Sequence, residues 1–219
     1  MYIMYKCEEY LMQKGLLISF EGTDGCGKST QIRLLSEYLK AKGKSVVISR
    51  EPGGCKVGEK IRNILLNAEN VEISPMCELF LYEAARAQHM SQVIEPALNE
   101  GKIVILDRFI DSTFAYQGYG RKLGEECVDL FNKYAINHRY PDVTLMLTLK
   151  ADDAFKRKGG NDTKDRMEMA GDDFFKRVDE GLKRASEKYS DRIIKVDVEG
   201  TCDETHQKIC ALIDNLLEK

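Results

Sequence analysis

The sequence lacks the features that mark a membrane protein or a secreted, disulfide-bonded protein. No apolar run approaches the ~18 residues that a bilayer-spanning helix requires. The N-terminal residues lack the apolar stretch of a signal peptide, because Lys6, Glu8 and Glu9 interrupt it. The 7 cysteines are odd in number and contain no C-x-x-C pair, which argues against a disulfide framework and against a zinc site. We therefore expect reduced thiols, a cytoplasmic location and no membrane partner.

An excess of one charge sign is also missing. Lys and Arg number 33, Asp and Glu number 36, and the net charge is −3. This balance leaves no broad basic surface for nucleic acid, so we expect no such partner and only local basic sites. The 3 histidines, His89, His138 and His206, are scattered along the chain. We interpret each as a surface or helix-packing residue and not as a ligand or a general base.

No Ser-, Pro- or Gly-rich linker divides the chain, and 43% hydrophobic residues suffice for a full core. We expect an N-terminal extension over residues 1–14 and a single domain over residues 15–219. The extension mixes aromatic and charged residues and contains further methionines at Met4 and Met12. It is either a short extra helix or a start that precedes the true initiator at Met12.

A glycine-rich loop is the most informative feature that is present. Gly22-x4-Gly27-Lys28-Ser29 lies between an apolar run at 16–20 and a segment of helical spacing at 31–39. Glycines allow successive backbone N–H groups and the helix N-terminus to point at a phosphate. We expect Lys28 to reach the β and γ phosphates of a nucleoside triphosphate and Ser29 to bind Mg²⁺. The expected phosphate-binding loop comprises Gly22, Thr23, Asp24, Gly25, Cys26, Gly27, Lys28, Ser29 and Thr30.

Strand patterns alternate with helical patterns along the rest of the chain, which predicts an α/β fold with a parallel sheet between helices. The expected strands are 16–20, 45–49, 102–106, 143–148 and 193–196. After the first helix, the expected helices are 58–67, 75–99, 123–137, 151–157, 172–189 and 203–217. Ligands of such sheets bind at the carboxyl ends of the strands, where the glycine loop, Glu51, Asp107 and Arg108 fall.

The strand at 102–106 ends in a carboxylate, Asp107. In P-loop proteins a carboxylate at a strand end lies near Mg²⁺ or its waters, so we expect this role for Asp107. Arg108 follows, and the segment 109–121 is dense in hydrogen-bonding and aromatic groups that could line a pocket for a planar, phosphorylated ligand. The segment also fits an amphipathic helix that Asp111 caps and Gly118 ends, and both interpretations can hold together.

A basic segment at 155–168 contains five cations and two glycines. We expect it to form a mobile lid, because phosphoryl transfer spreads negative charge that cations can neutralise above a site from which water is excluded. Arg157 and Arg166 are the candidate cations. The alternative is an ordinary solvated connection between helices.

Several blocks, in order, resemble the thymidylate kinase family. They are Phe20–Thr30, Arg50-Glu51-Pro52-Gly53-Gly54, Ala84–Gln88, Asp107–Arg121 and Asp165-Arg166-Met167-Glu168. The resemblance covers nearly the whole chain after the N-terminal extension. It implies a P-loop NTPase fold with a five-stranded parallel sheet, a homodimer, and conversion of dTMP to dTDP with Mg²⁺ and ATP in dTTP biosynthesis.

The resemblance also implies roles for individual residues. Asp24 would lie near the acceptor phosphate and the sugar 3′-hydroxyl, Arg108 would clamp that phosphate, and Glu168 would lie on the lid side of the nucleotide. The implied acceptor-binding residues are Glu51, Tyr82, Arg86, Arg108, Ser112, Thr113, Tyr116 and Gln117. Within this set, Tyr82 would stack on thymine, Arg86 and Thr113 would bond its edge with Gln117 nearby, and Tyr116 would crowd a ribose 2′-hydroxyl.

The catalytic set that the resemblance implies is Lys28, Arg108, Arg157, Arg166 and Asp24, with Ser29 and Asp107 at the metal. Position Gly25 lacks the loop arginine of eukaryotic members, so the catalytic cation is expected from the lid, as in bacterial-type members.

Two other functions stay open at the level of sequence. A kinase for another small acceptor would share the donor half, and for a hydroxyl acceptor Glu51 would be the candidate base. A nucleotide-dependent switch or motor is the second alternative. Against it, the chain has no Asn-Lys-x-Asp motif, and Asp107 is followed by Arg-Phe instead of the Asp-x-x-Gly of a GTPase switch.

Overall fold

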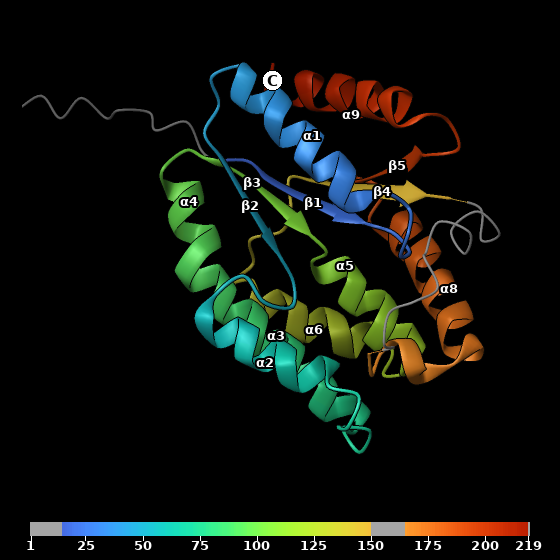
Figure 1. Cartoon of the computed structure of the whole chain (residues 1–219). Coiled ribbons are helices and arrows are strands. Elements are labelled where there is room, and N and C mark those ends of the chain that lie inside the picture. The colour runs from blue at the N-terminus through green and yellow to red at the C-terminus, as the bar shows by residue number, and fades with distance from the viewer. Residues whose placement is uncertain (1–14, 150–164, 219) are drawn as a thin grey trace, which may run out of the picture.

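A parallel sheet of five strands, in the order β2-β3-β1-β4-β5, forms the centre of the computed structural model (Figure 1). The structure describes residues 15–149 and 165–218. The expected extension at 1–14, the expected helix at 151–157 and the lid cation Arg157 lie outside the described residues. The strands are β1 Leu17–Glu21, β2 Val46–Arg50, β3 Ile103–Asp107, β4 Val143–Thr148 and β5 Ile193–Asp197. The predicted α/β fold with a parallel sheet is confirmed.

Helices cover both faces of the sheet. The helices are α1 Lys28–Ala41, α2 Lys56–Leu66, α3 Pro75–His89, α4 Glu95–Asn99, α5 Ile110–Thr113, α6 Glu125–Ala135, α8 Asp172–Lys188 and α9 Cys202–Leu217. Two π-helical segments, η1 Met90–Ile94 and η2 Phe114–Gly120, and a 3₁₀ turn, η3 Glu168–Ala170, complete the described elements. In Figure 1, α1 and α9 lie on one face, and α3, α5, α6 and α8 lie on the other. No helix within the described ranges has both the length and the apolar character to cross a bilayer.

Strand register aligns the residues that carry polar groups at the carboxyl edge. Strands β1 and β3 pair with Phe20 opposite Asp107, and β2 pairs with β3 so that Arg50 is also opposite Asp107. The apolar parts of β1, β3 and β4 are buried on both faces, as expected for a parallel sheet between helices. The edge that follows Phe20 and Asp107 is therefore held on a rigid core.

Two local predictions differ from the structure. The expected helix at 75–99 is continuous in the chain but includes the π-helical segment η1 between α3 and α4. The interpretation of Asp111 as a helix cap is wrong, because Phe109 is the N-cap and the carboxylate of Asp111 is buried. Arg192 holds that carboxylate with two bonds of 2.7 Å, and the helical segment continues through η2 beyond Gly118.

Candidate active site

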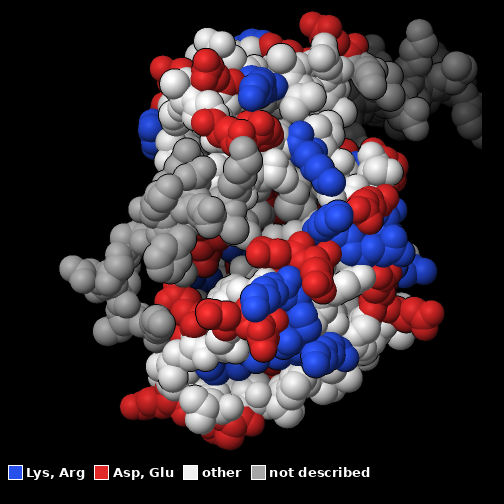
Figure 2. Space-filling view, turned by 90° about the vertical axis from the view of Figure 1, so that its right-hand side faces the viewer, with Lys and Arg blue, Asp and Glu red and all other residues white. Residues whose placement is uncertain are grey.

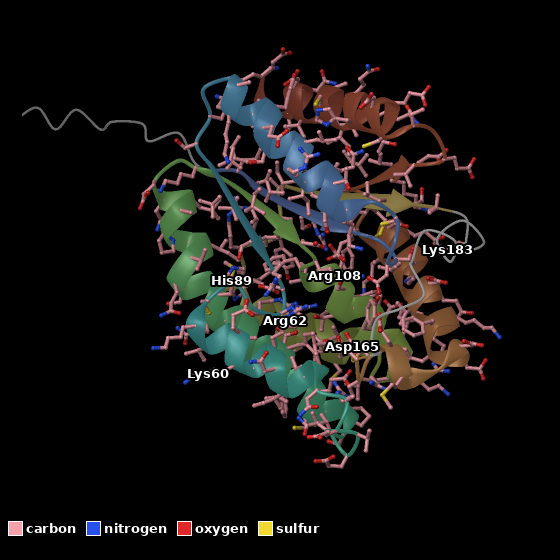
Figure 3. All side chains as sticks on the ribbon, viewed as in Figure 1. Lys60, Arg62, His89, Arg108, Asp165 and Lys183 are labelled. Atoms are coloured by element: carbon pink, nitrogen blue, oxygen red, sulfur yellow. The ribbon has the colours of Figure 1, made fainter. Side chains whose placement is uncertain are left out.

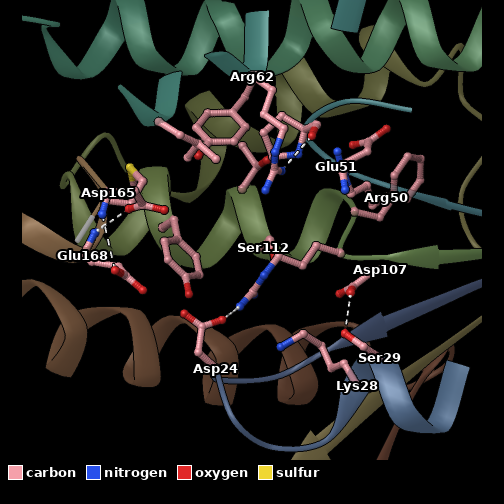
Figure 4. Close-up of a pocket in the computed structure, with 18 of the residues that line it drawn as sticks. Asp24, Lys28, Ser29, Arg50, Glu51, Arg62, Asp107, Ser112, Asp165 and Glu168 are labelled. Atoms are coloured by element: carbon pink, nitrogen blue, oxygen red, sulfur yellow. Dashed lines mark hydrogen bonds and ion pairs between the residues drawn. The ribbon is translucent and has the colours of Figure 1, made fainter. Parts of the chain in front are cut away.

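A cavity of about 490 Å³ opens at the carboxyl edge of the sheet, between the phosphate loop and the helices opposite it (Figure 4). The face shown in Figure 2 is hollowed, and both acidic and basic side chains surround the hollow. The cavity brings together every predicted acceptor-binding residue: Glu51, Tyr82, Arg86, Arg108, Ser112, Thr113, Tyr116 and Gln117. From the predicted loop it is lined by Asp24, Gly25, Gly27, Lys28, Ser29 and Thr30, and Asp107 lies beside them.

The loop between β1 and α1 has the backbone that phosphate binding requires. Gly22, Gly25 and Gly27 have φ values of 136°, 80° and 95°, which side-chain-bearing residues rarely adopt. At Gly22 a Cβ would lie 2.5 Å from the carbonyl oxygen of Leu147. Among the described residues no side chain caps the N-terminus of α1, so its first N–H groups remain available to an anion.

Lys28 lies folded over this loop. Its Nζ donates to the carbonyl oxygens of Gly22 and Thr23, each at 3.0 Å. Burial, and next the nearby Arg108, lower the pKa of Lys28. A phosphate would give this ammonium group a stronger, charged acceptor.

Ser29 and Asp107 form the predicted metal-binding pair. The Ser29 hydroxyl donates to Oδ2 of Asp107 at 3.3 Å, across the ends of α1 and β3. Within the described ranges no group of three or more His, Cys, Asp or Glu side chains is placed to hold a metal. Two oxygen donors beside a phosphate loop fit Mg²⁺, which takes few protein ligands and completes its shell with waters and phosphate oxygens.

Arg108 lies at the centre of the cavity with a left-handed backbone, φ 65°. Its guanidinium donates to Oδ1 of Asp24 at 2.7 Å and to the Ser112 hydroxyl at 3.1 Å. It also lies over the ring of Tyr116, with 5.3 Å from Cζ to the ring centroid. These contacts use part of its five N–H donors and fix the direction of the fork, which suits bidentate contact with a phosphate.

Glu21, the last residue of β1, holds the turn that carries Arg108. Its Oε1 accepts the backbone N–H groups of Phe109 at 2.7 Å and Ser112 at 3.1 Å, and the carboxyl is fully buried. Burial, and next the charge of Asp111, raise the pKa of Glu21 to about 7. The first strand thus positions both the phosphate loop and the opposite side of the cavity.

Arg86 on α3 is buried against the acceptor end of the cavity and is only 1% exposed. Each of its five N–H donors has a protein acceptor. The acceptors are Glu51 at 2.8 Å, Glu83 at 2.8 Å, Asn132 at 2.9 Å, Thr113 at 2.9 Å and the Phe109 carbonyl at 3.3 Å. A ligand that bonds Arg86 must therefore share or replace one of these contacts.

His89 extends this network. It is a buried packing residue at the end of α3, so of its two interpretations helix packing holds and a surface position does not. The ring is fully buried, with Nδ1 3.0 Å from Oε1 of Glu51 and Nε2 2.7 Å from the Ser49 hydroxyl. Gly54 packs over the pair, since a Cβ there would lie 2.3 Å from Nε2 of His89. His89 thus fixes one oxygen of Glu51, and Arg86 fixes the other.

Comparison with known proteins agrees with the geometry. The sequence profile of the thymidylate kinase family matches residues 20–209. The chain belongs to this family. The thymidylate kinases of Thermoanaerobacter sp. (strain X514) and Chlorobaculum tepidum are each 45% identical to this chain; both alignments cover 93% of it, and 100% and 99% of the respective relatives. The crystal structure of thymidylate kinase from Ehrlichia chaffeensis has a TM-score of 0.73 and 32% identity, covering 91% of this chain and 98% of that one.

Four predicted site residues of the described ranges do not line the cavity: Gly22, Thr23 and Cys26 of the loop, and Arg166. Arg166 is buried, with an ion pair of 2.7 Å from NH1 to Glu78 and a bond of 2.7 Å from Nε to the Leu65 carbonyl. Its neighbours Asp165, Met167 and Glu168 line the cavity instead. Asp165 and Glu168 bond one another's backbone N–H groups, at 2.9 Å and 3.3 Å.

Two cavity arginines were absent from the predicted site. Arg50 pairs with Glu59 at 3.0 Å, and Arg62 on α2 donates to the Pro52 carbonyl at 2.9 Å. In Figure 3, Arg62 and Arg108 point into the region between the sheet and the lower helices, whereas Lys60 points outward. Burial, and next the charge of Arg50, lower the pKa of Arg62. Arg50 stands at a strand end within a family block and could have been found; Arg62 carries no local signal.

Proposed function

We propose that this chain transfers the γ-phosphoryl group of ATP to dTMP and yields dTDP and ADP, a step in dTTP synthesis. One observation carries the proposal: a single cavity joins a phosphate loop to the full set of acceptor-binding residues that the thymidylate kinase resemblance implies. Membership of the thymidylate kinase family argues against the switch or motor alternative.

The reaction is a direct in-line transfer with no covalent enzyme intermediate. The acceptor phosphate is itself a nucleophile at neutral pH, so positioning and charge neutralisation can supply the acceleration. Arg108 holds the acceptor phosphate, and Asp24, which is 2.7 Å from the Arg108 guanidinium, sets the direction of that contact. Lys28 leaves the carbonyls of Gly22 and Thr23 to bind the donor phosphates.

Ser29 and Asp107 would hold Mg²⁺, which neutralises charge on the donor phosphates when it is bound. The other loop residues, Gly22 to Thr30, supply backbone N–H groups to the same phosphates. Arg157 is the proposed lid cation. Arg166 would contribute by anchoring the end of the lid segment, because its guanidinium is held by Glu78 and Leu65.

The acceptor base lies between Tyr82 and the residues of α5 and η2. Tyr82 provides a stacking face, Thr113 and Gln117 provide edge contacts, and Tyr116 fills the space beside the sugar. Glu51 supports Arg86 from below, since both of its oxygens are taken by Arg86 and His89. This engagement argues against Glu51 as a general base for a hydroxyl acceptor.

A homodimer is proposed on the face formed by α2, α3 and α6. Large apolar side chains on this face are exposed at one-turn or two-turn spacing: Val57, Ile64, Met76, Phe80, Leu130 and Tyr134. Phe80 of α3 and Phe131 of α6 contact edge to face with centroids 5.1 Å apart, which joins the two helices in one surface. Such a contiguous patch is typical of a protein interface. A single mass near that of a monomer in light scattering would contradict this proposal.

We also propose a cytoplasmic location without a nucleic-acid partner. Support comes from the balanced net charge of −3 and from the cysteines of the described ranges, all of which are free thiols. These free cysteines include the buried Cys26 and the exposed Cys77.

The experiment that tests the function measures ADP formation from ATP and Mg²⁺ with dTMP, dUMP, dCMP, UMP, AMP and thymidine at equal concentration. We expect dTMP to be strongly preferred. Turnover with a different acceptor alone would retain the kinase and reject the thymine assignments, and no turnover with any acceptor would reject the proposed function.

A further inference from the structure

Glu78 is a fully buried carboxylate on α3, and its one part in the mechanism above is to hold Arg166. Its oxygens accept from three residues that follow it in the chain by about 40 positions or more. Gln117 Nε2 lies 2.8 Å from Oε1, the Arg121 guanidinium 2.9 Å from Oε2, and Arg166 NH1 2.7 Å from Oε2. Glu78 thus ties α3 to η2 and to the segment that begins at 165.

The bond to Gln117 fixes the orientation of an amide that lines the cavity. A carboxylate offers only acceptors, so Gln117 must turn its nitrogen, and not its oxygen, toward Glu78. The two neighbouring arginines, Arg121 and Arg166, pair with this buried carboxylate and compensate its charge. Gln117 lines the cavity, and its side-chain hydrogen bond among the described residues is the one that Nε2 donates to Glu78.

We propose that Glu78 is a positioning residue that sets base specificity through Gln117. By holding Nε2, it presents Oε1 as an acceptor to the edge of the acceptor base. Thymine and uracil carry a hydrogen on N3 and can donate to this oxygen. Cytosine has an unprotonated N3 and would place two acceptors against each other, which is costly in a buried site. This inference rests on the proposed function and explains how that pocket excludes dCMP.

The test compares kcat/KM for dTMP, dUMP and dCMP in the wild type and in Glu78→Gln. In the variant, the residue at 78 can either accept from or donate to Gln117, so the Gln117 amide can reverse. The ratio of kcat/KM for dTMP to that for dCMP should fall by about 100-fold, because the polar mismatch is removed. The KM for ATP should stay unchanged.

Arg121→Gln is the matched control. It removes a different partner of the same carboxylate but leaves the bond between Glu78 and Gln117. We expect lower stability and an unchanged dTMP to dCMP ratio. If Glu78→Gln instead lowers turnover of all three nucleotides by one factor, Glu78 has only a structural role and the inference fails.

A second measurement needs no variant at position 78. The side-chain amide of Gln117 can be assigned by ¹⁵N NMR from the signal that disappears in Gln117→Met. In the wild type these N–H signals should remain protected from solvent exchange both before and after dTMP is added. Loss of protection on adding dTMP would overturn the assigned orientation. Absence of dTMP turnover in the wild type would refute the proposed function itself, which separates the two failures.

Discussion

At the donor end of the cavity the polar groups come from one continuous loop between β1 and α1, whereas at the acceptor end they come from segments far apart in the sequence. Among the described residues, Lys28 donates to two backbone carbonyls, those of Gly22 and Thr23, and to the sulfur of Cys26, all within its own loop. Arg86 bonds side chains that follow β2 and that lie on α3, α5 and α6. The donor end is therefore a single loop attached to the core, whereas the acceptor end consists of side chains that belong to the core.

The largest effect expected from this difference is on activity alone. Lys28→Met should lower kcat/KM by about 1,000-fold or more, because it removes a cation from the donor phosphates. Its free energy of unfolding should change by no more than about 1 kcal/mol, since its partners are backbone carbonyls beside the cavity. Steady-state kinetics and urea unfolding check both values. Lys60→Met, at the outward-pointing residue of α2 in Figure 3, should leave both unchanged. A strongly destabilised Lys28→Met would contradict the view that the donor end contributes little to stability.

Arg86→Met should instead destabilise the fold by about 3–5 kcal/mol, because it leaves the buried carboxylates of Glu51 and Glu83 without their cation. Burial already raises the pKa of Glu83. The control is Arg33→Met, which removes an exposed ion pair with Glu37 and should cost less than about 1 kcal/mol. Urea unfolding of the two variants measures the difference, and equal losses would show that burial of the network contributes nothing.

Substitutions at two glycines with nearly the same φ distinguish the cost of backbone strain from the cost of close packing. Gly54 has φ 75° and packs on His89, while Gly43 has φ 76° and open space around it. Gly43→Ala should cost about 1 kcal/mol from backbone strain alone. Gly54→Ala should cost about 2 kcal/mol more, since the added Cβ displaces His89 from Glu51. Thermal or urea unfolding decides this, and identical costs would mean that the His89 contact adjusts freely.

The smallest expected effect is a change in how the free energy of unfolding depends on pH. The pKa of Glu21 is raised to about 7 in the folded protein, above 4.5 in the unfolded chain. Its contribution to stability is therefore fully present below pH 4.5 and is lost as the pH rises toward 7. Glu21→Gln removes this titration. The difference in free energy of unfolding between the variant and the wild type should therefore change steadily between pH 4.5 and 7. Parallel curves for the two proteins would contradict the raised pKa.

The same comparison explains what sequence alone could predict. The glycine loop can be predicted as one unit because its residues are contiguous, and its phosphate binding stays a prediction. Asp107 can be expected near Ser29 because parallel strands end at one edge, and the two side chains lie 3.3 Å apart. The five strands follow from apolar runs, although their order in the sheet does not, since side-chain periodicity carries no information on neighbours.

The contacts that the sequence does not predict all join residues that are distant in the chain. Asp111 has the local pattern of a helix cap, but Arg192, which is 81 positions away, holds its carboxylate inside the protein. His89 and Glu78 look like ordinary residues of an amphipathic helix until Ser49, Glu51 and Gln117 are brought to them. The role of Arg166 as a lid cation stays a prediction, and its basic neighbours give no sign of its ion pair with Glu78, 88 positions earlier by residue number. A single sequence does not specify such pairs.

Phe20, Asp107 and Arg50 lie side by side on three neighbouring strands, so the length of β3 determines which residue stands between the other two. If β3 lost one residue before Asp107 while keeping its pairing, Arg108 would take the place opposite Arg50. The place beside Arg50 that now carries a carboxylate would then carry a second cation, and the oxygen partner of Ser29 would be gone. For anyone redesigning this protein, the count of residues in β3 controls whether a carboxylate or a cation lies opposite Arg50, whereas the apolar residues within the strand can be exchanged among similar types.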